Sequence, residues 1–428
     1  MIKGLVGEKL VHSYSKLIHE KIANDVYNLY SLTKEEFDLF FKQKEFDFVN
    51  VTIPYKQDVI PYLDFISEEA KEIGAVNLVV NKDGKLYGYN TDYYGLKYLF
   101  EDSKINLNNK KCLILGTGGT SKTALKVLSD LGAETIYRSS RTKKEDALSY
   151  EEVYEYDFNI IVNTTPVGMY PNINQRIIDL GKFKKLEFVC DCVYNPFRTG
   201  LLLDAESLNI NNTNGLKMLI VQAIKAHEIA LNTEVKAEII NKIYFDLLSE
   251  NLNVVLVGMP GSGKSTIGKE LAKRLSMQFV DVDTYIEEKN NRTISQIFAD
   301  FGEEFFRLKE TEACKDVALM KKMVIATGGG VVKKKRNIDL LKSNGVVINV
   351  NRSVENIFKD LKKTLDDGTN YRPLFKNLES LEKIYNERKD LYLNSSDYNV
   401  DNNDDFEKCI NQIINFVVRG CDKKWLYH

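Results

Sequence analysis

The sequence contains few of the features that mark secreted, membrane or nucleic-acid-binding proteins. Its 428 residues include one Trp, four His, six Cys and seven Pro. No apolar run approaches the roughly 18 residues that span a membrane, and the first residues form no apolar signal segment. The 59 Lys and Arg nearly balance the 61 Asp and Glu, with no basic block interleaved with aromatic residues. We therefore expect a cytoplasmic protein that binds neither membrane nor nucleic acid.

The cysteines are scattered along the chain. Only Cys190 and Cys192 lie close together, at a spacing that matches neither a CxxC redox pair nor a zinc knuckle. We expect all six to be buried, reduced thiols. The length exceeds what one hydrophobic core usually serves and predicts two or three domains.

The strongest motif is GMPGSGKS at 258–265, which fits GxxxxGK[ST]. It follows an apolar, strand-like run at 254–257 and precedes a helical pattern at 266–274, which is the context of a phosphate-binding loop. A glycine-rich turn that binds nothing is the alternative, and the flanking elements disfavour it. In such a loop the lysine bridges the outer phosphates and the serine offers its hydroxyl to Mg²⁺. The predicted ATP-binding residues are Gly258, Gly261, Ser262, Gly263, Lys264, Ser265 and Thr266.

Three later segments carry candidate binding groups. Asp281 and Asp283 end a strand-like run at i and i+2, so we expect them on one face, one for Mg²⁺ and one for a substrate hydroxyl. An exposed acidic strand end is the alternative. Arg307 and Glu310 share a helix face, as a plain surface ion pair also would. The strand at 324–327 ends in three glycines, which let a small ligand contact backbone.

The first half opens with a strand at 2–7, then His12-Ser13-Tyr14-Ser15 before a helical pattern at 18–30. The two serines could simply cap that helix. Strand-like runs follow at 47–53 and 73–80. Lys56 and Asp92 each follow such a run, where catalytic groups often lie in α/β folds, although solvent exposure alone would explain either one.

A dinucleotide-binding turn follows the buried strand 111–115. Gly116 suits the tight turn and Gly118 the close approach of a pyrophosphate, whereas the third glycine position holds Ser121. The next strand ends in the basic stretch 138–144. Arginine and lysine at this point suit a 2′-phosphate, which favours NADP over NAD. Further elements are expected as strands at 158–163 and 186–194, and helices at 215–231 and 234–248.

Eight motifs in this order resemble shikimate dehydrogenase over residues 1–248. They are HSYS (12–15), NVTIPYK (50–56), GAVN (74–77), GYNTD (88–92), GTGGTSK (116–122), VNTTPVGM (162–169), DCVYNP (191–196) and GLKMLIVQA (215–223). The resemblance implies a substrate domain at 1–100, completed by helices at 215–248, around an NADP-binding Rossmann domain at 101–214.

The resemblance also implies site residues. Lys56 and Asp92 would be the catalytic pair. The substrate would be bound by Ser13, Ser15, Thr52, Asn77, Tyr194 and Gln222, and NADP by Gly116, Gly118, Gly119, Ser140, Arg141, Thr142, Gly215 and Met218. Three positions depart from the family pattern: Lys16 replaces a proline, Glu20 an asparagine, and Ser140 the asparagine of an Asn-Arg-Thr triplet.

The second half resembles shikimate kinase through DVD (281–283), GEEFFR (302–307), ATGGG (326–330) and YRPLF (371–375). The resemblance implies a P-loop kinase domain with a parallel sheet at 251–428. Lys264, Asp283 and Arg372 would be catalytic, Ser265 and Asp281 would hold Mg²⁺, and shikimate would contact Asp283, Arg307, Gly329, Gly330 and Arg388. Lys359 stands where the family has an arginine near adenine.

Together the halves predict an α/β bifunctional enzyme of aromatic biosynthesis. It would reduce 3-dehydroshikimate with NADPH and phosphorylate the resulting shikimate with ATP and Mg²⁺. Two alternatives stay open at this stage: a dehydrogenase half that also accepts quinate, and a first half that senses shikimate without turnover. The sequence leaves the oligomeric state undetermined.

Overall fold

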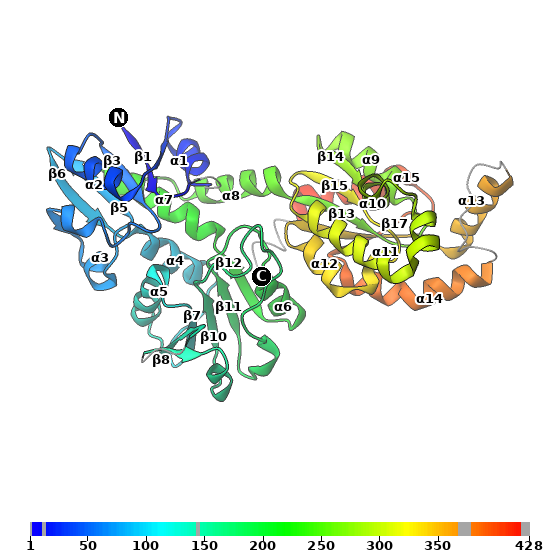
Figure 1. The fold of residues 1–428 in the computed structure, drawn as a ribbon, viewed down its shortest axis with the longest axis horizontal. Helices are drawn as coiled ribbons and strands as arrows, with labels where there is room; N and C mark the ends of the chain where they lie inside the picture. The colour runs from blue at the N-terminus through cyan, green and yellow to red at the C-terminus, as the bar shows by residue number, and fades with distance from the viewer. Residues whose placement is uncertain (1, 11–13, 143–145, 367–377, 421–428) are drawn as a thin grey trace. The chain divides into compact units, whose positions relative to one another are not determined.

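The computed structural model describes residues 2–10, 14–142, 146–366 and 378–420. They form two compact α/β units (Figure 1). Unit 1 comprises Met1–Met169 and Gln175–Leu247, and unit 2 comprises Tyr170–Asn174 and Leu248–Tyr427.

The elements of unit 1 follow in chain order. They are β1 (Lys3–Gly7), α1 (Ser15–Ala23), β2 (Asn28–Ser31), α2 (Lys34–Gln43), β3 (Phe48–Val51), η1 (Ile60–Tyr62), β4 (Phe65–Ile66), α3 (Glu68–Ile73), β5 (Leu78–Lys82), β6 (Lys85–Tyr89), α4 (Thr91–Asp102), β7 (Lys111–Leu115), α5 (Gly119–Asp130), β8 (Thr135–Ser140), β9 (Leu148–Ser149), η2 (Glu152–Glu155), β10 (Ile160–Asn163), η3 (Leu180–Lys182), β11 (Phe188–Asp191), α6 (Gly200–Ser207), β12 (Asn211–Asn214), α7 (Leu216–Leu231) and α8 (Glu238–Asn251), whose last residues belong to unit 2.

The elements of unit 2 begin with the strand before the phosphate-loop motif. They are β13 (Asn253–Val257), α9 (Lys264–Arg274), β14 (Gln278–Asp281), α10 (Val282–Asn290), α11 (Ile294–Ala318), β15 (Met323–Ala326), η4 (Val331–Lys333), α12 (Lys335–Lys342), β16 (Gly345–Asn351), α13 (Val354–Asp366), α14 (Leu378–Ser395), β17 (Tyr398–Asp401), α15 (Phe406–Asn415) and η5 (Phe416–Gly420).

The first sheet of unit 1 has the order β2-β1-β3-β5-β6-β4. β1 pairs in parallel with β2 and β3, whereas β5 runs antiparallel to β3 and β6. Phe37 and Phe41 of α2 are fully buried against this sheet, because they lie four residues apart on one helix face. Thr33 and Glu36 begin α2 with a reciprocal capping box.

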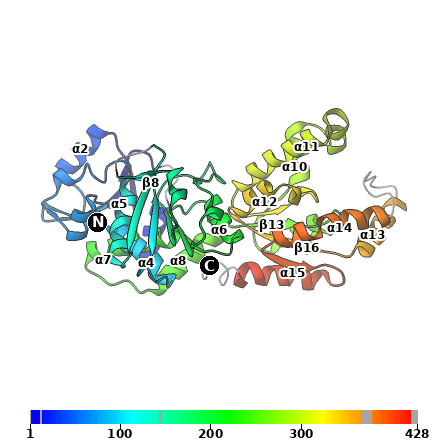
Figure 2. The same ribbon diagram turned by 90° about the horizontal axis from the view of Figure 1, so that it is seen from below.

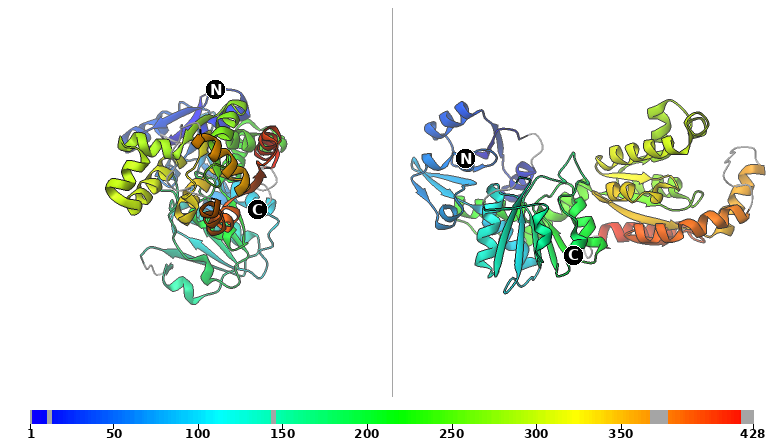
Figure 3. Two further views of the ribbon diagram at one scale, coloured as in Figure 1. Left: turned by 90° about the vertical axis from the view of Figure 1, so that its right-hand side faces the viewer. Right: turned by 60° about the horizontal axis from the view of Figure 1, so that its bottom comes forward.

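The second sheet of unit 1 is parallel throughout, in the order β12-β11-β10-β7-β8-β9. The strand order reverses at β7, which lies between β8 and β10. Ligands of open parallel sheets bind beyond the carboxyl end of the strand where the order reverses. Figure 3 shows these strands together in the cyan and green part of the chain, and α4 and α7 pack against each other beside them (Figure 2).

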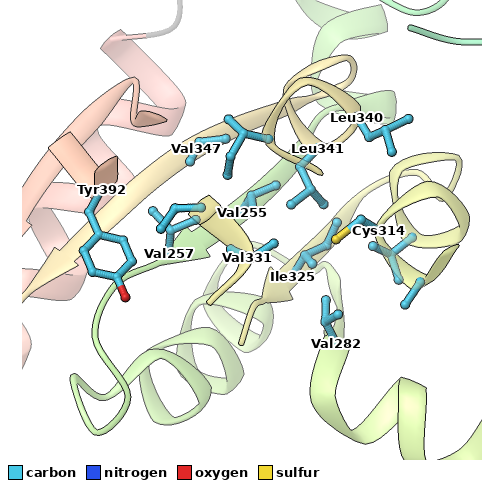
Figure 4. Packing of buried hydrophobic residues seen from close by; sticks show 14 of the residues in the cluster. Val255, Val257, Val282, Cys314, Ile325, Val331, Leu340, Leu341, Val347 and Tyr392 are labelled. Carbon is cyan, nitrogen blue, oxygen red and sulfur yellow. The ribbon is translucent and has the colours of Figure 1, made fainter. Parts of the chain in front are cut away.

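Unit 2 holds a parallel sheet of order β14-β15-β13-β16-β17. Val255, Ile325 and Val347 from its three central strands are fully buried, and Cys314 of α11 and Leu341 of α12 pack with them (Figure 4). Strands buried on both faces read as continuous apolar runs, as β13 does. The central position of β13 brings the following loop to the middle of the sheet edge.

Several boundaries differ from the sequence expectation. The helix expected at 18–30 ends at Ala23, where Asn24 adopts a left-handed conformation and closes it. The run 73–80 was expected to be one strand, but α3 extends to Ile73 and the strand starts at Leu78. Gly74 caps α3 with φ 68°. Residues 74–77 therefore form the connection between α3 and β5.

The cysteine expectation holds for most of the described positions. Cys112, Cys190, Cys314 and Cys409 are free and buried. Cys192 is free but only partly buried, because it lies just beyond the end of β11. Cys421 lies outside the described residues.

A pair of buried histidines joins α1 to α7. His19 Nδ1 lies 2.9 Å from His227 Nε2, and the His19 ring stacks on Tyr27 with centroids 4.0 Å apart. Burial lowers the pKa of both imidazoles, to about 4 for His227, and the buried Lys3 ammonium acts in the same direction. Both rings are therefore neutral at pH 7.

This pair predicts acid sensitivity of the fold. The unfolded chain binds protons at pKa 6.5 but folded His227 only near 4, so stability is complete above pH 6.5 and falls as the pH drops toward 4. We expect His227 alone to cost about 2 kcal/mol of unfolding free energy between about pH 7 and pH 5. Urea unfolding of wild type and His227→Gln at both pH values tests this. An equal pH dependence in the two proteins would contradict the assignment.

Candidate active sites

The first candidate site centres on an ion pair between Lys56 and Asp92. Lys56 lies in the turn after β3, and Asp92 lies in the first turn of α4, which Asn90 caps by accepting from the Tyr93 N–H at 3.2 Å. Lys56 Nζ donates to Asp92 Oδ2 at 2.6 Å, with side-chain exposures of 20% and 13%. A partly buried ammonium with one fixed partner can still donate a proton to a ligand that enters from solvent.

Buried amide and hydroxyl groups surround the start of α4. Asn77 Oδ1 accepts from the Thr91 N–H at 2.6 Å, and Thr91 Oγ1 lies 3.3 Å from Gln222 Oε1. These contacts bring Asn77, after α3, together with Gln222 on α7. Thr52 follows β3 with a half-buried side chain, on the same connection as Lys56. Sequence reasoning missed Thr91, which links the two predicted substrate residues.

Tyr14, the residue before Ser15, forms an aromatic contact with Tyr194. Ser15 is the buried first residue of α1, and the preceding Tyr14 has its ring centroid 5.5 Å from that of Tyr194. Burial raises the pKa of Tyr194, so its hydroxyl is a neutral hydrogen-bonding group. The exposed Lys16 ammonium lies 3.8 Å from Glu20. Ser13 lies outside the described residues.

The glycine turn after β7 leaves space at the helix that follows. Gly116 has φ 114°, which favours glycine, and a Cβ there would lie 2.7 Å from Thr164 Oγ1. Gly118 is the N-cap residue of α5. A Cβ at Gly118 or Gly119 would meet nothing within 4 Å. The buried Ser121 hydroxyl has no hydrogen-bond partner among the described residues. Open space at a helix N-terminus fits a dinucleotide pyrophosphate.

In the described part of the basic turn after β8, residues 138–142, Arg141 is an exposed cation. Arg141 and Thr142 are exposed, and the Ser140 hydroxyl donates to the Thr142 carbonyl. Arg138 pairs instead with the Asp146 carboxylate, which offsets its charge. Of the two guanidinium groups at this turn, Arg141 is therefore the exposed one.

The start of α7 follows β12 and lies at the carboxyl edge of the second sheet of unit 1. The Gly215 N–H donates to the Val193 carbonyl at 3.1 Å, and Met218 packs against Gly95 of α4, where a Cβ would lie 2.5 Å from the Met218 carbonyl oxygen. Gly215 therefore lies beside the loop after β11, and Met218 lies in the buried layer between α4 and α7.

The second candidate site is the loop between β13 and α9. Lys264 Nζ donates to the carbonyls of Gly258 and Met259 at 3.0 and 2.9 Å, so its ammonium lies over the loop. The Ser265 hydroxyl donates to Asp281 Oδ2 at 2.6 Å, which unites the two predicted Mg²⁺ groups. Gly261, Ser262, Gly263 and Thr266 complete the loop and first turn.

Sequence reasoning missed Asn402, which follows β17. Asn402 Nδ2 donates to the Ser262 carbonyl at 2.9 Å and thereby supports the phosphate loop from a segment far along the chain. Asn402 lies in the polar stretch Asp401-Asn402-Asn403-Asp404, which gave no sequence signal of this contact. Lys359 is exposed on α13.

The glycine run after β15 collects the other predicted groups of unit 2. A Cβ at Gly328 would lie 2.5 Å from Asp283 Oδ1, and Gly330 packs against the Arg307 guanidinium. Arg388 Nη1 donates to the Gly329 carbonyl at 3.2 Å. Two arginines and one carboxylate from different helices therefore meet at one short backbone segment.

The Glu310 carboxylate holds the Arg307 guanidinium in place. Both Glu310 oxygens lie 3.0 Å from Arg307 Nη1, and the Glu310 side chain is only 1% exposed. Burial raises the pKa of Glu310, while Arg307 acts to lower it. The pair is thus a buried anchor, unlike the surface ion pair that helix spacing alone would also allow.

The structure corrects the predicted geometry of Asp281 and Asp283. β14 ends at Asp281, whose side chain caps α10 by accepting from the Asp283 N–H at 3.0 Å. Asp283 lies in the first helical turn, so the two carboxylates do not share a strand face. They diverge instead, toward Ser265 and Gly328 respectively. Arg372 lies outside the described residues.

The oxygen donors at the phosphate loop of unit 2 are suited to Mg²⁺. Among the described residues, no group of three or more His, Cys, Asp or Glu side chains forms a metal site. Mg²⁺ in phosphoryl-transfer sites typically takes one or two protein ligands together with substrate phosphates and water. The Ser265 hydroxyl and Asp281 carboxylate match that donor set.

No helix in the described ranges is long and apolar enough to cross a membrane.

The two units define a Rossmann-type oxidoreductase part and a P-loop phosphotransferase part. A family model for the shikimate dehydrogenase substrate binding domain matches residues 5–79. The NADP⁺-dependent shikimate dehydrogenase of Clostridium beijerinckii is 40% identical over 243 residues, which cover 53% of this chain and 90% of that protein. Through its N-terminal part, this chain belongs to the shikimate dehydrogenase family.

Solved structures and a second family model extend the comparison. Shikimate dehydrogenase 1 from Peptoclostridium difficile is 40% identical, with a TM-score of 0.53, and the match covers 57% of this chain and 97% of that one. A shikimate dehydrogenase solved with NADP⁺ is 31% identical, with a TM-score of 0.52 and coverage of 57% and 95%. A shikimate kinase family model matches residues 260–418.

Proposed function

We propose that this chain is a bifunctional enzyme of the shikimate pathway. Unit 1 reduces 3-dehydroshikimate to shikimate with NADPH, and unit 2 phosphorylates shikimate to shikimate 3-phosphate with ATP. The observation that carries the proposal is the presence of both families' motif sets in one chain, with family models that match residues 5–79 and 260–418. The product of the first reaction is the substrate of the second.

The Lys56–Asp92 pair supports the reduction. NADPH, when bound, supplies a hydride to the carbonyl carbon. The Lys56 ammonium stabilises the developing alkoxide and gives it a proton, which yields the hydroxyl of shikimate. Asp92, 2.6 Å from Lys56 Nζ, orients the ammonium.

The substrate would be held by groups around this pair. Ser13 and Ser15 would bind its carboxylate, and its hydroxyls would contact Asn77, Thr52, Gln222 and Tyr194. NADP would lie along the glycine turn Gly116 to Gly119 and against Ser140, Arg141, Thr142, Gly215 and Met218.

The groups of unit 2 support phosphoryl transfer, which depends mainly on positioning and neutralisation of charge. Lys264 would neutralise the outer phosphates, and Ser265 with Asp281 would hold Mg²⁺. Arg307 and Arg388 would grip the shikimate carboxylate as planar forks, beside the backbone of Gly329 and Gly330. Asp283 would accept a hydrogen bond from the reacting hydroxyl. Arg372 would close over the transferred phosphate.

Two alternatives make different predictions. A shikimate sensor in unit 1 would need neither the Lys56–Asp92 pair nor a cation at the end of β8. A dehydrogenase that also accepts quinate would keep both, because Thr52 and Asn77 do not discriminate between the two substrates. The test follows NADPH oxidation with 3-dehydroshikimate, then ATP-dependent formation of shikimate 3-phosphate by the same protein. Binding of shikimate without NADPH oxidation would favour the sensor, and oxidation of quinate would widen the substrate range.

Arg141 provides a test of cofactor choice. We expect Arg141→Ala to raise the KM for NADPH by about 10-fold, because a charged hydrogen bond contributes about 1.5–3 kcal/mol. The KM for NADH should change less than about twofold, since NADH has no 2′-phosphate for the guanidinium. Steady-state kinetics with both cofactors measures the ratio.

Arg138→Ala is the matched control for Arg141. It removes the same charge three residues earlier, where the guanidinium pairs with Asp146. The NADPH to NADH preference should therefore change less in this variant. Equal losses with both cofactors in Arg141→Ala would mean that Arg141 does not read the phosphate.

A further inference from the structure

A buried hydrogen-bond chain centred on Asp191 lies at the carboxyl edge of the second sheet. Asp191 ends β11 and is fully buried. Its Oδ1 accepts from Asn163 Nδ2 at 2.9 Å and from the Val193 N–H at 3.0 Å, and its Oδ2 accepts from the Thr199 hydroxyl at 2.6 Å. Asn163 in turn ends the neighbouring strand β10, and its Oδ1 accepts from the Thr165 N–H at 3.0 Å.

Backbone donors fix the direction of this chain. The N–H groups of Thr165 and Val193 can only donate, so Asn163 must present its oxygen to Thr165 and its NH₂ to Asp191. Asp191 Oδ1 must therefore accept twice. A side chain without an oxygen at this point would leave two buried donors unsatisfied.

This hydrogen-bond chain supports the glycine turn after β7 and the start of α7, which are predicted to contact the dinucleotide, and the loop after β10, which packs against the glycine turn. Through Asn163 it orders the loop at Thr164 and Thr165, which packs against Gly116. Through Val193 it orders the turn whose carbonyl accepts from the Gly215 N–H at 3.1 Å. The loop after β10, the glycine turn after β7 and the start of α7 thus depend on one buried carboxyl group.

We propose that Asp191 is a positioning residue for the NADP site, acting through Asn163 on the loop that packs against the glycine turn and through Val193 on the start of α7. This inference rests on the proposed dehydrogenase function. What it requires at position 191 is an oxygen that accepts from both donors, and a negative charge is not needed.

The surroundings of Oδ2 explain why charge is dispensable. Burial raises the pKa of Asp191 to about 7, against the hydrogen bonds from Thr199, Val193 and Asn163, which lower it. The Thr199 hydroxyl can donate to an ionised Oδ2 or accept from a protonated one. An asparagine at 191 would keep its oxygen toward Asn163 and Val193 and donate its NH₂ to Thr199.

Two substitutions in the full-length protein test the proposal, with NADPH as the probe. Fluorescence titration should show that Asp191→Ala binds NADPH about 10-fold more weakly, while Asp191→Asn stays within about twofold of wild type. The KM for the dehydrogenase substrate should change less than about twofold in both variants. The kinase rate of the same chain should be unchanged and serves as the control for intact unit 2.

The outcomes separate this inference from the function on which it rests. Wild type that fails to bind NADPH would overturn the proposed function. Wild type that binds NADPH, with Asp191→Ala equally tight or Asp191→Asn as weak as Asp191→Ala, would overturn the positioning role alone. If the alanine variant does not fold, Asn163→Leu repeats the test, because it removes the side-chain donor to Asp191 with little change of size and cannot form a shared-proton pair with that carboxyl group. Unchanged NADPH affinity in that variant would also refute the role.

Discussion

Replacing Lys264 with alanine is expected to slow the kinase reaction about 1000-fold at saturating substrates. The Lys264 ammonium lies over the phosphate loop, 3.0 and 2.9 Å from the carbonyls of Gly258 and Met259, and its side chain is buried. ATP phosphates would supply better partners than these neutral carbonyls. Alanine would leave the transferred phosphoryl group without the ammonium that is predicted to neutralise its charge. The rate of shikimate 3-phosphate formation at saturating ATP measures the effect.

The same chain contains the controls for this experiment. Lys269→Ala removes an exposed lysine from the same helix, α9, and should leave the kinase rate within about twofold of wild type. The Lys264→Ala protein should also keep the wild-type rate of NADPH-dependent reduction, because the catalytic groups of that reaction belong to unit 1. Loss of both activities in a folded Lys264→Ala protein would contradict the assignment of two separate sites.

The sequence predicted the parts of the fold whose signal is local. β7 and β13 are apolar runs that end in glycine turns, and the structure has both strands, each followed by a helix. In each case the motif and its flanking elements agree, because a phosphate-binding turn requires a strand before it and a helix after it. The α/β class and the two families follow from the same local signals.

The groups that the sequence did not predict are linked by long-range contacts. Asp191 and Asn163 are 28 residues apart, and Asn402 supports Ser262 from 140 residues away. Asn163 and Asp191 lie within two of the motifs that resemble shikimate dehydrogenase, but their spacing gave no sign of a contact between them, and Asn402 belongs to no motif. Only the pairing of β10 with β11, or the placement of β17 beside β16, brings such residues together. Local reasoning likewise placed Asp283 on a strand, because it did not anticipate that Asp281 would cap a helix immediately.

Lys56→Ala should produce the complementary loss. We expect the reduction catalysed by unit 1 to slow about 1000-fold at saturating substrates, since the variant lacks the group that would protonate and stabilise the alkoxide. Kinase activity should be unaffected. Lys71→Ala is the matched control, because this lysine of α3 is exposed and pairs with Glu68, three residues earlier on the same helix, at 2.8 Å. Stopped-flow measurement of NADPH oxidation compares the three proteins.

The cause of the loss can be separated from a general disturbance of unit 1. Removal of Lys56 leaves the Asp92 carboxylate without the ammonium 2.6 Å away, in a site where both side chains are mostly covered. A small primary amine in the buffer could occupy the space and restore part of the rate, since it supplies the same N–H donor and proton. We expect such rescue to rise with the concentration of the protonated amine. A Lys56→Ala protein that retained more than about a tenth of the wild-type rate without added amine would show that another group protonates the product.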